Sequence, residues 1–135
     1  PTPDGRSNIL LRGLARCRIL EELPSGRLYR LVRAEPLFEQ AGDVSRTQAA
    51  MAQLVVMTER LSRLLPSGGP TLKKLVASQD VAGPLCDVLT AALVTDADTR
   101  QSLLETLDVA LRTERLTAEV ASLVATLHDR TSPAN

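Results

Sequence analysis

Aromatic residues, histidine and cysteine are scarce in this chain. Its 135 residues include one tyrosine, one phenylalanine, no tryptophan and one histidine. The core must therefore be built from aliphatic side chains, and leucine, the commonest residue, is a strong helix former. Basic and acidic residues number 16 each, so no net charge attracts nucleic acid or an anionic membrane. The composition predicts one globular domain, alone or with an appendage, that is mostly helical.

The few cysteines and the single histidine form no pattern typical of a metal or catalytic centre. Cys17 and Cys86 belong to no CxxC pair or cysteine–histidine cluster, and we expect two buried free thiols rather than a disulfide. His128 stands alone and cannot form a metal site by itself. Cys86 would need a general base to act as a nucleophile, and His128 is the one candidate. We expect no catalytic residue, no metal and no cofactor.

Other polar segments have structural explanations. Residues 67–74 hold two glycines and two lysines but lack the GxxxxGK[ST] order of a phosphate loop, so we interpret them as a loop between helices. No sequence pattern pairs Lys73 or Lys74 with a serine. Asp96 and Asp98 lie at a predicted helix start, where capping accounts for them.

Arginines are frequent in the first 44 residues, where seven of them accompany six carboxylates. The outer face of an antiparallel sheet needs such residues, because their stems cover apolar surface while the charged ends stay in water. RNA binding usually adds stacking aromatics, and only Tyr29 is available. We favour a solvated sheet face over a nucleic-acid patch.

No apolar run approaches the roughly 18 residues that are needed to span a bilayer. The cysteines also lack the spacing of a disulfide framework. We therefore expect a reduced, cytoplasmic protein that does not contact a membrane.

The first 38 residues show strand patterns separated by turns. Three strands are predicted, over residues 7–14, 16–23 and 27–35, with turns at 3–6 and 24–26 and a stop at Pro36. Within 16–23, Arg16, Arg18 and Leu20 alternate with Cys17, Ile19 and Glu21, which is the period of a half-buried strand.

The predicted sheet is incomplete. The turn at residues 3–6 has only two residues before it, although a hairpin turn needs a strand on both sides. Three strands of this length also make a poor independent sheet. We expect the sequence to begin partway through a domain, with the sheet completed by a missing amino-terminal half or by a second copy in a swapped dimer. We favour the missing half, because the ends to be joined are only a loop apart.

From Ser45 onward the pattern is helical. Helices are predicted from residue 45 to the break at 66–70, then over 71–78, 81–93 and 95–107, and from Asp108 onward. The predicted caps are Ser45 with Gln48, Thr95 with Asp98, and Asp108. The apolar stripes are Ala50, Leu54, Met57, Leu61 and Leu64; Val81, Leu85, Val88, Leu89 and Ala92; and Leu116, Val120, Leu123 and Leu127. We expect Leu89 and Leu123 to be buried and Arg112 to lie on a polar flank.

The order of several short motifs resembles one family. The motifs are Asp4-Gly5-Arg6, Asn8-Ile9-Leu10-Leu11-Arg12-Gly13, Pro24-Ser25-Gly26, Tyr29-Arg30, Glu35-Pro36-Leu37, and the helix corner at residues 103–109 with Arg112, Glu114, Arg115 and Leu116. In this order they resemble the amino-terminal, substrate-binding domain of the Lon proteases and the free-standing proteins built from that domain.

The resemblance implies an α+β fold in which a remnant of a small antiparallel β-domain precedes an α-helical bundle. We place the partial β-domain at residues 1–40, the bundle at 41–130 and a disordered tail at 131–135. Some features depart from the family. Ser7 stands where an aromatic is common, and Cys17 also replaces the commoner residue. The family's opening strands, the ATPase module and the serine-lysine peptidase module have no counterpart in this sequence.

The function implied by the resemblance is the binding of polypeptides without catalysis. We expect a non-catalytic module that binds unfolded or degron-bearing polypeptides or works with a protease partner. The candidate contact residues include both aromatics and are Tyr29, Leu31, Arg33, Leu37 and Phe38. Core packing is the competing interpretation for Leu31, Leu37 and Phe38. The alternative function is an RNA-binding or other interaction module of the same β-fold, and an independent hydrolase is a third hypothesis.

Overall fold

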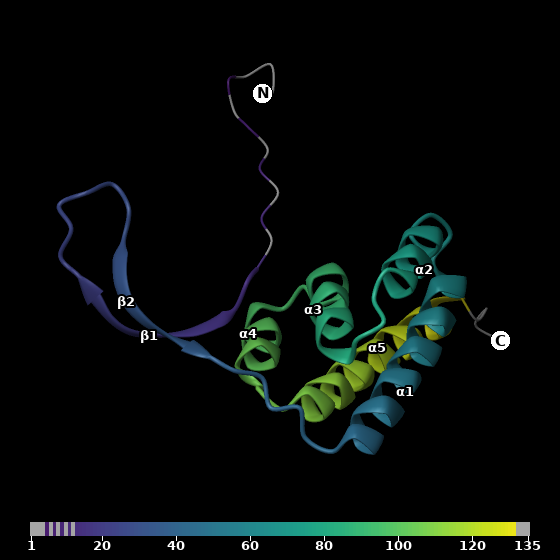
Figure 1. The fold of residues 1–135 in the computed structure, drawn as a ribbon. Helices are drawn as coiled ribbons and strands as arrows, with labels where there is room; N and C mark the ends of the chain where they lie inside the picture. Colours follow the sequence, from purple (N-terminus) through teal and green to yellow (C-terminus); the bar gives the residue numbers. More distant parts are fainter. Residues whose placement is uncertain (1–4, 6, 8, 10, 12, 132–135) are drawn as a thin grey trace. The chain divides into compact units, whose positions relative to one another are not determined.

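A computed structural model describes residues 5, 7, 9, 11 and 13–131 (Figure 1). The chain divides into two units, Pro1–Phe38 and Glu39–Asn135. In the described residues the first unit contains a two-stranded antiparallel sheet and the second contains five helices, which confirms the predicted α+β class. No helix in these ranges has both the length and the apolar character that crossing a membrane requires.

The sheet consists of β1 (Arg16–Leu23) and β2 (Leu31–Leu37), which pair antiparallel. The prediction of three strands is wrong, because the described residues of the segment 7–14 belong to no strand. A strand exists through backbone hydrogen bonds to a neighbour, and an apolar pattern cannot supply that neighbour. The rest of that segment, and all of the predicted turn at residues 3–6 except Gly5, lie outside the described residues.

β2 begins later than predicted and includes Pro36. The Ser25 hydroxyl donates to the Tyr29 carbonyl at 3.1 Å and accepts from the Arg27 N–H at 3.2 Å, which keeps these residues in a turn. Pro36 lies opposite Cys17 within the ladder. In a sheet of two strands every second N–H points away from the partner strand, so a proline at such a position removes no ladder bond.

A bulge at Leu20 decides which face each side chain of β1 occupies. The register shifts between Ile19 and Glu21. Arg18 and Ile19 lie on opposite faces, as predicted, but Glu21 joins the face of Arg18 rather than that of Ile19. The predicted place of Glu21 was wrong because one inserted residue inverts the alternation beyond it.

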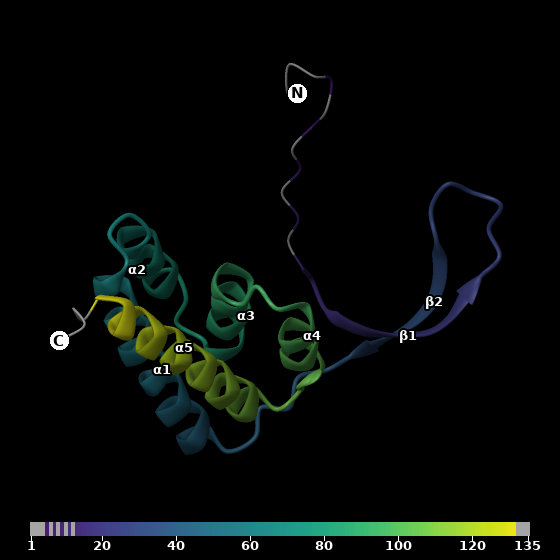
Figure 2. The same cartoon turned by 180° about the vertical axis from the view of Figure 1, so that it is seen from behind.

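The second unit contains the helices α1 (Val44–Leu64), α2 (Gly69–Ala77), α3 (Ala82–Leu93), α4 (Ala97–Glu105) and α5 (Val109–Thr131). The two long helices, α1 and α5, lie side by side, with α2 against α1 and α3 against α5 (Figures 1 and 2). Arg46 in the first turn of α1 bonds Glu114 near the start of α5, so these helices run in the same direction.

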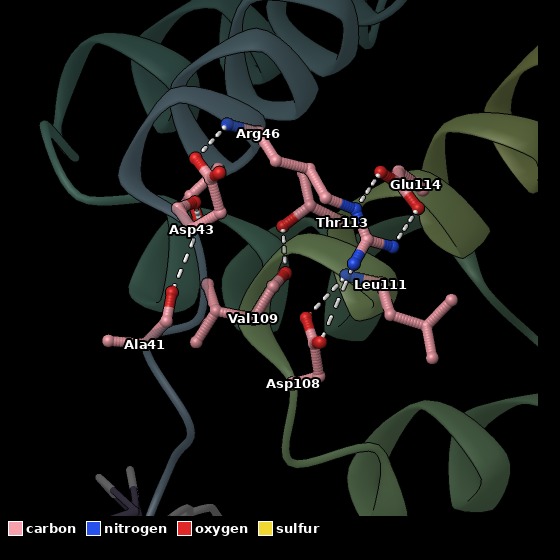
Figure 3. Close-up of polar contacts among 9 residues, drawn as sticks. Ala41, Asp43, Arg46, Asp108, Val109, Leu111, Thr113 and Glu114 are labelled. Carbon is pink, nitrogen blue, oxygen red and sulfur yellow. Dashed lines mark hydrogen bonds and ion pairs between the residues drawn. The ribbon is translucent and has the colours of Figure 1, made fainter.

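Three aspartates cap helices in this unit. The bonds run from the Arg46 N–H to Asp43 at 3.0 Å, from the Thr99 N–H to Asp96 at 2.7 Å, and from the Leu111 N–H to Asp108 at 2.9 Å. Figure 3 shows the first and the third of these. The Asp108 cap was predicted correctly. Ser45 and Thr95 were wrong predictions, because a neighbouring ionised carboxylate, Asp43 or Asp96, satisfies the free N–H groups more strongly than a hydroxyl.

The core of the helical unit is aliphatic. Its fully buried members include Leu54, Leu61, Leu85, Leu89, Leu116 and Val120. The stripe predicted on α1 is buried or partly buried throughout. On α5, however, Leu123 is 37% exposed and Val124 is buried in its place. Both residues continue the line of Leu116 and Val120 on a helix of 3.6 residues per turn, and packing against neighbouring helices selects Val124.

Arg112 is the main exception to the aliphatic core. It was predicted on a polar flank, but it is fully buried, with 0% of its surface exposed. Its Nη1 donates to the Thr106 carbonyl at 2.8 Å, its Nη2 donates to the Glu39 carboxylate, and its Nε lies 3.5 Å from Asp87 Oδ1. The prediction failed because these partners come from other segments, Glu39 from 73 positions away.

These positions give a test of the core. Leu89→Ala should lower the free energy of unfolding by about 2–5 kcal/mol, because it empties a fully buried site. Arg112→Ala should lower it by at least about 2 kcal/mol, because Glu39 and Asp87 would lose the cation between them. Leu123→Ala is the matched control and should change it by less than about 1 kcal/mol. Urea unfolding followed by circular dichroism measures all three, and equal losses at both leucines would contradict the assigned helix faces.

The caps predict how acid weakens the helical unit. Hydrogen bonds from Ser45 and from the Arg46 N–H lower the pKa of Asp43, and the bond from the Thr99 N–H lowers the pKa of Asp96. A carboxyl whose pKa is lower in the folded chain stabilises it above the unfolded pKa, about 3.9 for aspartate, and this stabilisation is lost as the pH falls through the folded value. We therefore expect the urea midpoint to fall on acidification below about pH 4.

The double change Asp43→Asn with Asp96→Asn provides the control. Asparagine caps a helix nearly as well as aspartate but does not titrate. Near neutral pH the variant should have the same urea midpoint as the unaltered chain. Between about pH 5 and about pH 2 its urea midpoint should fall less than that of the unaltered chain. An unchanged acid loss would show that these two caps do not contribute to it.

Candidate functional site

The five residues predicted to contact a partner all lie in the hairpin unit. Tyr29 precedes β2, Leu31, Arg33 and Leu37 lie within it, and Phe38 follows it. Because side chains alternate along a strand, Leu31, Arg33 and Leu37 share one face. The structure therefore brings three of the five onto one face and leaves the two aromatics at the two ends of the strand.

Both aromatic side chains of the chain are exposed. Tyr29 has 53% of its surface accessible and Phe38 has 81%. Leu31 is also exposed, and Leu37 is partly buried. Core packing was the competing interpretation for Leu31, Leu37 and Phe38, and within the described residues it applies only in part to Leu37. The hairpin thus presents accessible apolar surface.

The ring of Tyr29 is held by the turn before β2. Cζ of Arg27 lies 5.5 Å from the ring centroid, and Nη1 of Arg27 donates to the tyrosine hydroxyl. A concavity of about 410 Å³ lies beside the ring and is lined by residues from 22 to 30. Such a cation–π contact fixes an exposed ring before any partner arrives. The sequence interpretation missed Arg27 and Ser25, although an arginine two positions from a tyrosine in a Ser-Gly turn was a usable signal.

Three arginines of the hairpin are paired with carboxylates on the opposite strand or beyond the turn. Arg18 lies 3.0 Å from Glu35, Arg33 lies 2.9 Å from Glu21, and Arg30 lies 2.6 Å from Glu22. The bond from Arg30 lowers the pKa of Glu22. Exposed pairs of this kind contribute little stability, but they cancel local positive charge. This pairing fits a solvated sheet face, and it occupies Arg33, one of the predicted contact residues.

A second polar cluster joins the starts of α1 and α5 (Figure 3). Nε and Nη2 of Arg46 donate to the two carboxylate oxygens of Glu114 at 2.9 and 2.8 Å, and Nη1 lies 3.7 Å from Asp108 Oδ2. The arginine lowers the pKa of Glu114. Because the cation is fully engaged by carboxylates of its own unit, we interpret this cluster as a tie between two helices rather than as a binding site.

The cysteines and the histidine do not assemble into a reactive site. Cys86 is buried in α3, and burial raises the pKa of its thiol, which makes it a poor nucleophile. Cys17 is a free thiol as well, but it is exposed on β1, so the prediction that both thiols are buried is wrong for Cys17. The described residues of its own unit place no second layer over the hairpin. In the part of the chain that the structure describes, no three acidic, histidine or cysteine side chains are grouped to hold a metal.

The fold therefore defines a small α+β chain whose exposed aromatics lie on a hairpin. The family described as the ATP-dependent protease La (LON) substrate-binding domain matches residues 1–122. This chain belongs to that family.

Several bacterial relatives carry the same similarity. The Lon protease of Paraburkholderia phytofirmans is 28% identical over 127 residues, which are 92% of this chain and 15% of that protein. The Lon protease of Heliobacterium modesticaldum is 32% identical over 120 residues, 88% of this chain and 14% of that protein. The Lon protease of Desulfatibacillum aliphaticivorans is 31% identical over 108 residues, 78% of this chain and 13% of that protein. The chain thus spans only a small part of the length of these relatives.

Proposed function

We propose that this chain is a non-catalytic polypeptide-recognition module that binds unfolded or degron-bearing polypeptides through its hairpin. The observation that carries the proposal is the exposure of Tyr29 and Phe38, the only two aromatics of the chain, on the hairpin unit. Membership of a substrate-binding domain family supports it. Hydrolysis of a bound polypeptide would be supplied by a protease partner or by parts of a larger protein.

The physics of polypeptide recognition fits these residues. An exposed aromatic offers a large contact area and loses little side-chain entropy on binding, since only two torsions are fixed. Leu31 and Leu37 add apolar surface on one face of β2, and Arg33 adds a charged group that Glu21 already orients. An extended polypeptide can also pair with the free edge of a strand through its backbone.

The cellular location is part of the same proposal. Cys17 and Cys86 are free thiols, and Cys17 is exposed. Exposed free thiols persist best in a reducing compartment. We therefore place the module in the cytoplasm.

The binding proposal is tested by replacing the two aromatics. Tyr29→Ala and Phe38→Ala should each weaken binding of a fluorescently labelled, permanently unfolded polypeptide by about tenfold, because each removes a contact worth about 1.4 kcal/mol. Fluorescence anisotropy measures the affinity. Val56→Ala is the matched control, since it removes an exposed apolar side chain from α1 in the other unit. If all three variants bind as tightly as the unaltered chain, the hairpin is not the contact surface.

The expected lack of catalytic activity is tested separately. The purified chain should hydrolyse neither ATP nor a casein substrate, because its sequence has no phosphate loop and Cys86 is buried with a raised pKa. Phosphate release and fluorogenic casein assays measure the two activities. Hydrolysis above the buffer rate that disappears in Cys86→Ala or His128→Ala would overturn this part of the proposal.

A further inference from the structure

The first residues of the helical unit are fastened to its helices by their backbone. The Gln40 N–H donates to the Leu107 carbonyl at 2.9 Å, and the Val109 N–H donates to the Gln40 carbonyl at 3.2 Å. The Thr47 hydroxyl donates to the Ala41 carbonyl at 3.2 Å. We call residues 39–42 the strap. Because the first unit ends at Phe38, the strap begins directly where that unit stops.

A buried ion pair holds the first residue of the strap. Nη2 of Arg112 donates to the Glu39 carboxylate, and Arg112 has 0% of its surface exposed. The Glu39 side chain is still 38% exposed. The Arg112 side of this ion pair is therefore buried among the helices, whereas the Glu39 side is partly open to solvent. Such a contact can open from the strap side without unfolding the helices beneath it.

The Glu39 carboxylate lies in space that is open only because residue 83 is a glycine. A Cβ atom on Gly83, in the first turn of α3, would lie 2.9 Å from Oε2 and 3.4 Å from Oε1 of Glu39, and 3.4 Å from Nη2 of Arg112. Any larger residue at Gly83 would push the flexible end of the Glu39 side chain away. The carboxylate thus occupies space that the missing side chain of Gly83 leaves open.

We infer that Glu39, Arg112 and Gly83 form a latch that lets the strap open as a separate element while the helices stay folded. In the closed state the strap is bonded to the helices as far as Glu39, which directly follows Phe38 in the chain. In the open state four residues become free chain with a reach of up to about 14 Å. The latch is a conformational device that sets the length of the tether between the two units. It does not depend on whether the hairpin binds polypeptide.

The backbone amides of Gln40 and Val109 report the state of the strap, because Gln40 donates from the strap to the Leu107 carbonyl and Val109 donates to the Gln40 carbonyl of the strap. In hydrogen exchange of the whole chain these amides should be protected, and Gly83→Ala should speed their exchange at least about tenfold by expelling the Glu39 carboxylate. The amides of Leu116 and Val120 should be unaffected. The helices should stay folded, with an unchanged far-ultraviolet circular dichroism spectrum, although the loss of a carboxylate beside the buried Arg112 lowers their unfolding midpoint. A purely structural role for Gly83 would instead speed all four amides together.

Two more variants make the outcome decisive. Glu39→Ala should reproduce the effect of Gly83→Ala, because it removes the carboxylate itself. Gly68→Ala is the matched control, since a Cβ atom there meets only ordinary contacts with Leu65 and should leave exchange at Gln40 unchanged. The latch proposal is wrong if the Gln40 amide exchanges without protection in the unaltered chain. It is also wrong if the exchange rate of this amide is unchanged in both Gly83→Ala and Glu39→Ala.

The change in tether length is measured directly with two labels. Cys17 is an exposed thiol on the first unit, and Ala125→Cys adds one on the exposed side of α5. Pulsed electron paramagnetic resonance should give a distance distribution that becomes broader when Gly83→Ala or Glu39→Ala opens the strap. An identical distribution in the latched and unlatched chains would overturn the role of the latch in setting the tether.

Discussion

The burial of one guanidinium group organises the helical unit. A buried cation is stable only where charges and hydrogen-bond acceptors of the protein replace water. Arg112 finds them on three segments: Glu39 at the start of the unit, Asp87 on α3, and the Thr106 carbonyl at the end of α4. The last is one of the carbonyls that a helix end leaves without an intrahelical donor, so the contact satisfies both groups. Aliphatic packing brings helices together, and this arginine fixes which segments meet around the start of α5.

The hairpin unit follows a different principle. Its strands are joined by a backbone ladder and by ion pairs between arginines and glutamates, with the bulge at Leu20 placing Glu21 beside Arg18 on one face. Among the described residues of the unit, no second layer covers its apolar side chains, and Tyr29 and Phe38 stay accessible. A recognition surface needs accessible apolar groups, whereas a stable core needs the same groups buried. Under the proposed function, the chain separates the two needs by giving each its own unit.

Much of the secondary structure could be predicted from the sequence. The bounds of β1, the Asp108 cap and the buried stripe of α1 agree with the structure, and a break does follow α1, although it ends earlier than predicted because α2 begins at Gly69. Each depends on residues within one or two turns of one another: side-chain period, proline and glycine, or a carboxylate three positions before a free N–H. The family resemblance was also carried by such local motifs. For the candidate contact residues, the sequence supplied the choice of Tyr29 and Phe38 as the only aromatics.

Only the tertiary structure decided the burial of Arg112, the exposure of Leu123 and Phe38, and the face of Glu21. A polar flank and a buried ion cluster have the same sequence pattern, because the partners that make burial tolerable come from distant segments. Likewise, a stripe of period 3.6 allows either Leu123 or Val124 to face inward, and neighbouring helices make the choice. The sequence by itself determined where most of the helices form, since those forces act between near neighbours, whereas the strand pattern at residues 7–14 produced no strand among the described residues. Which side chains are buried depended on long-range packing, which no local pattern encodes.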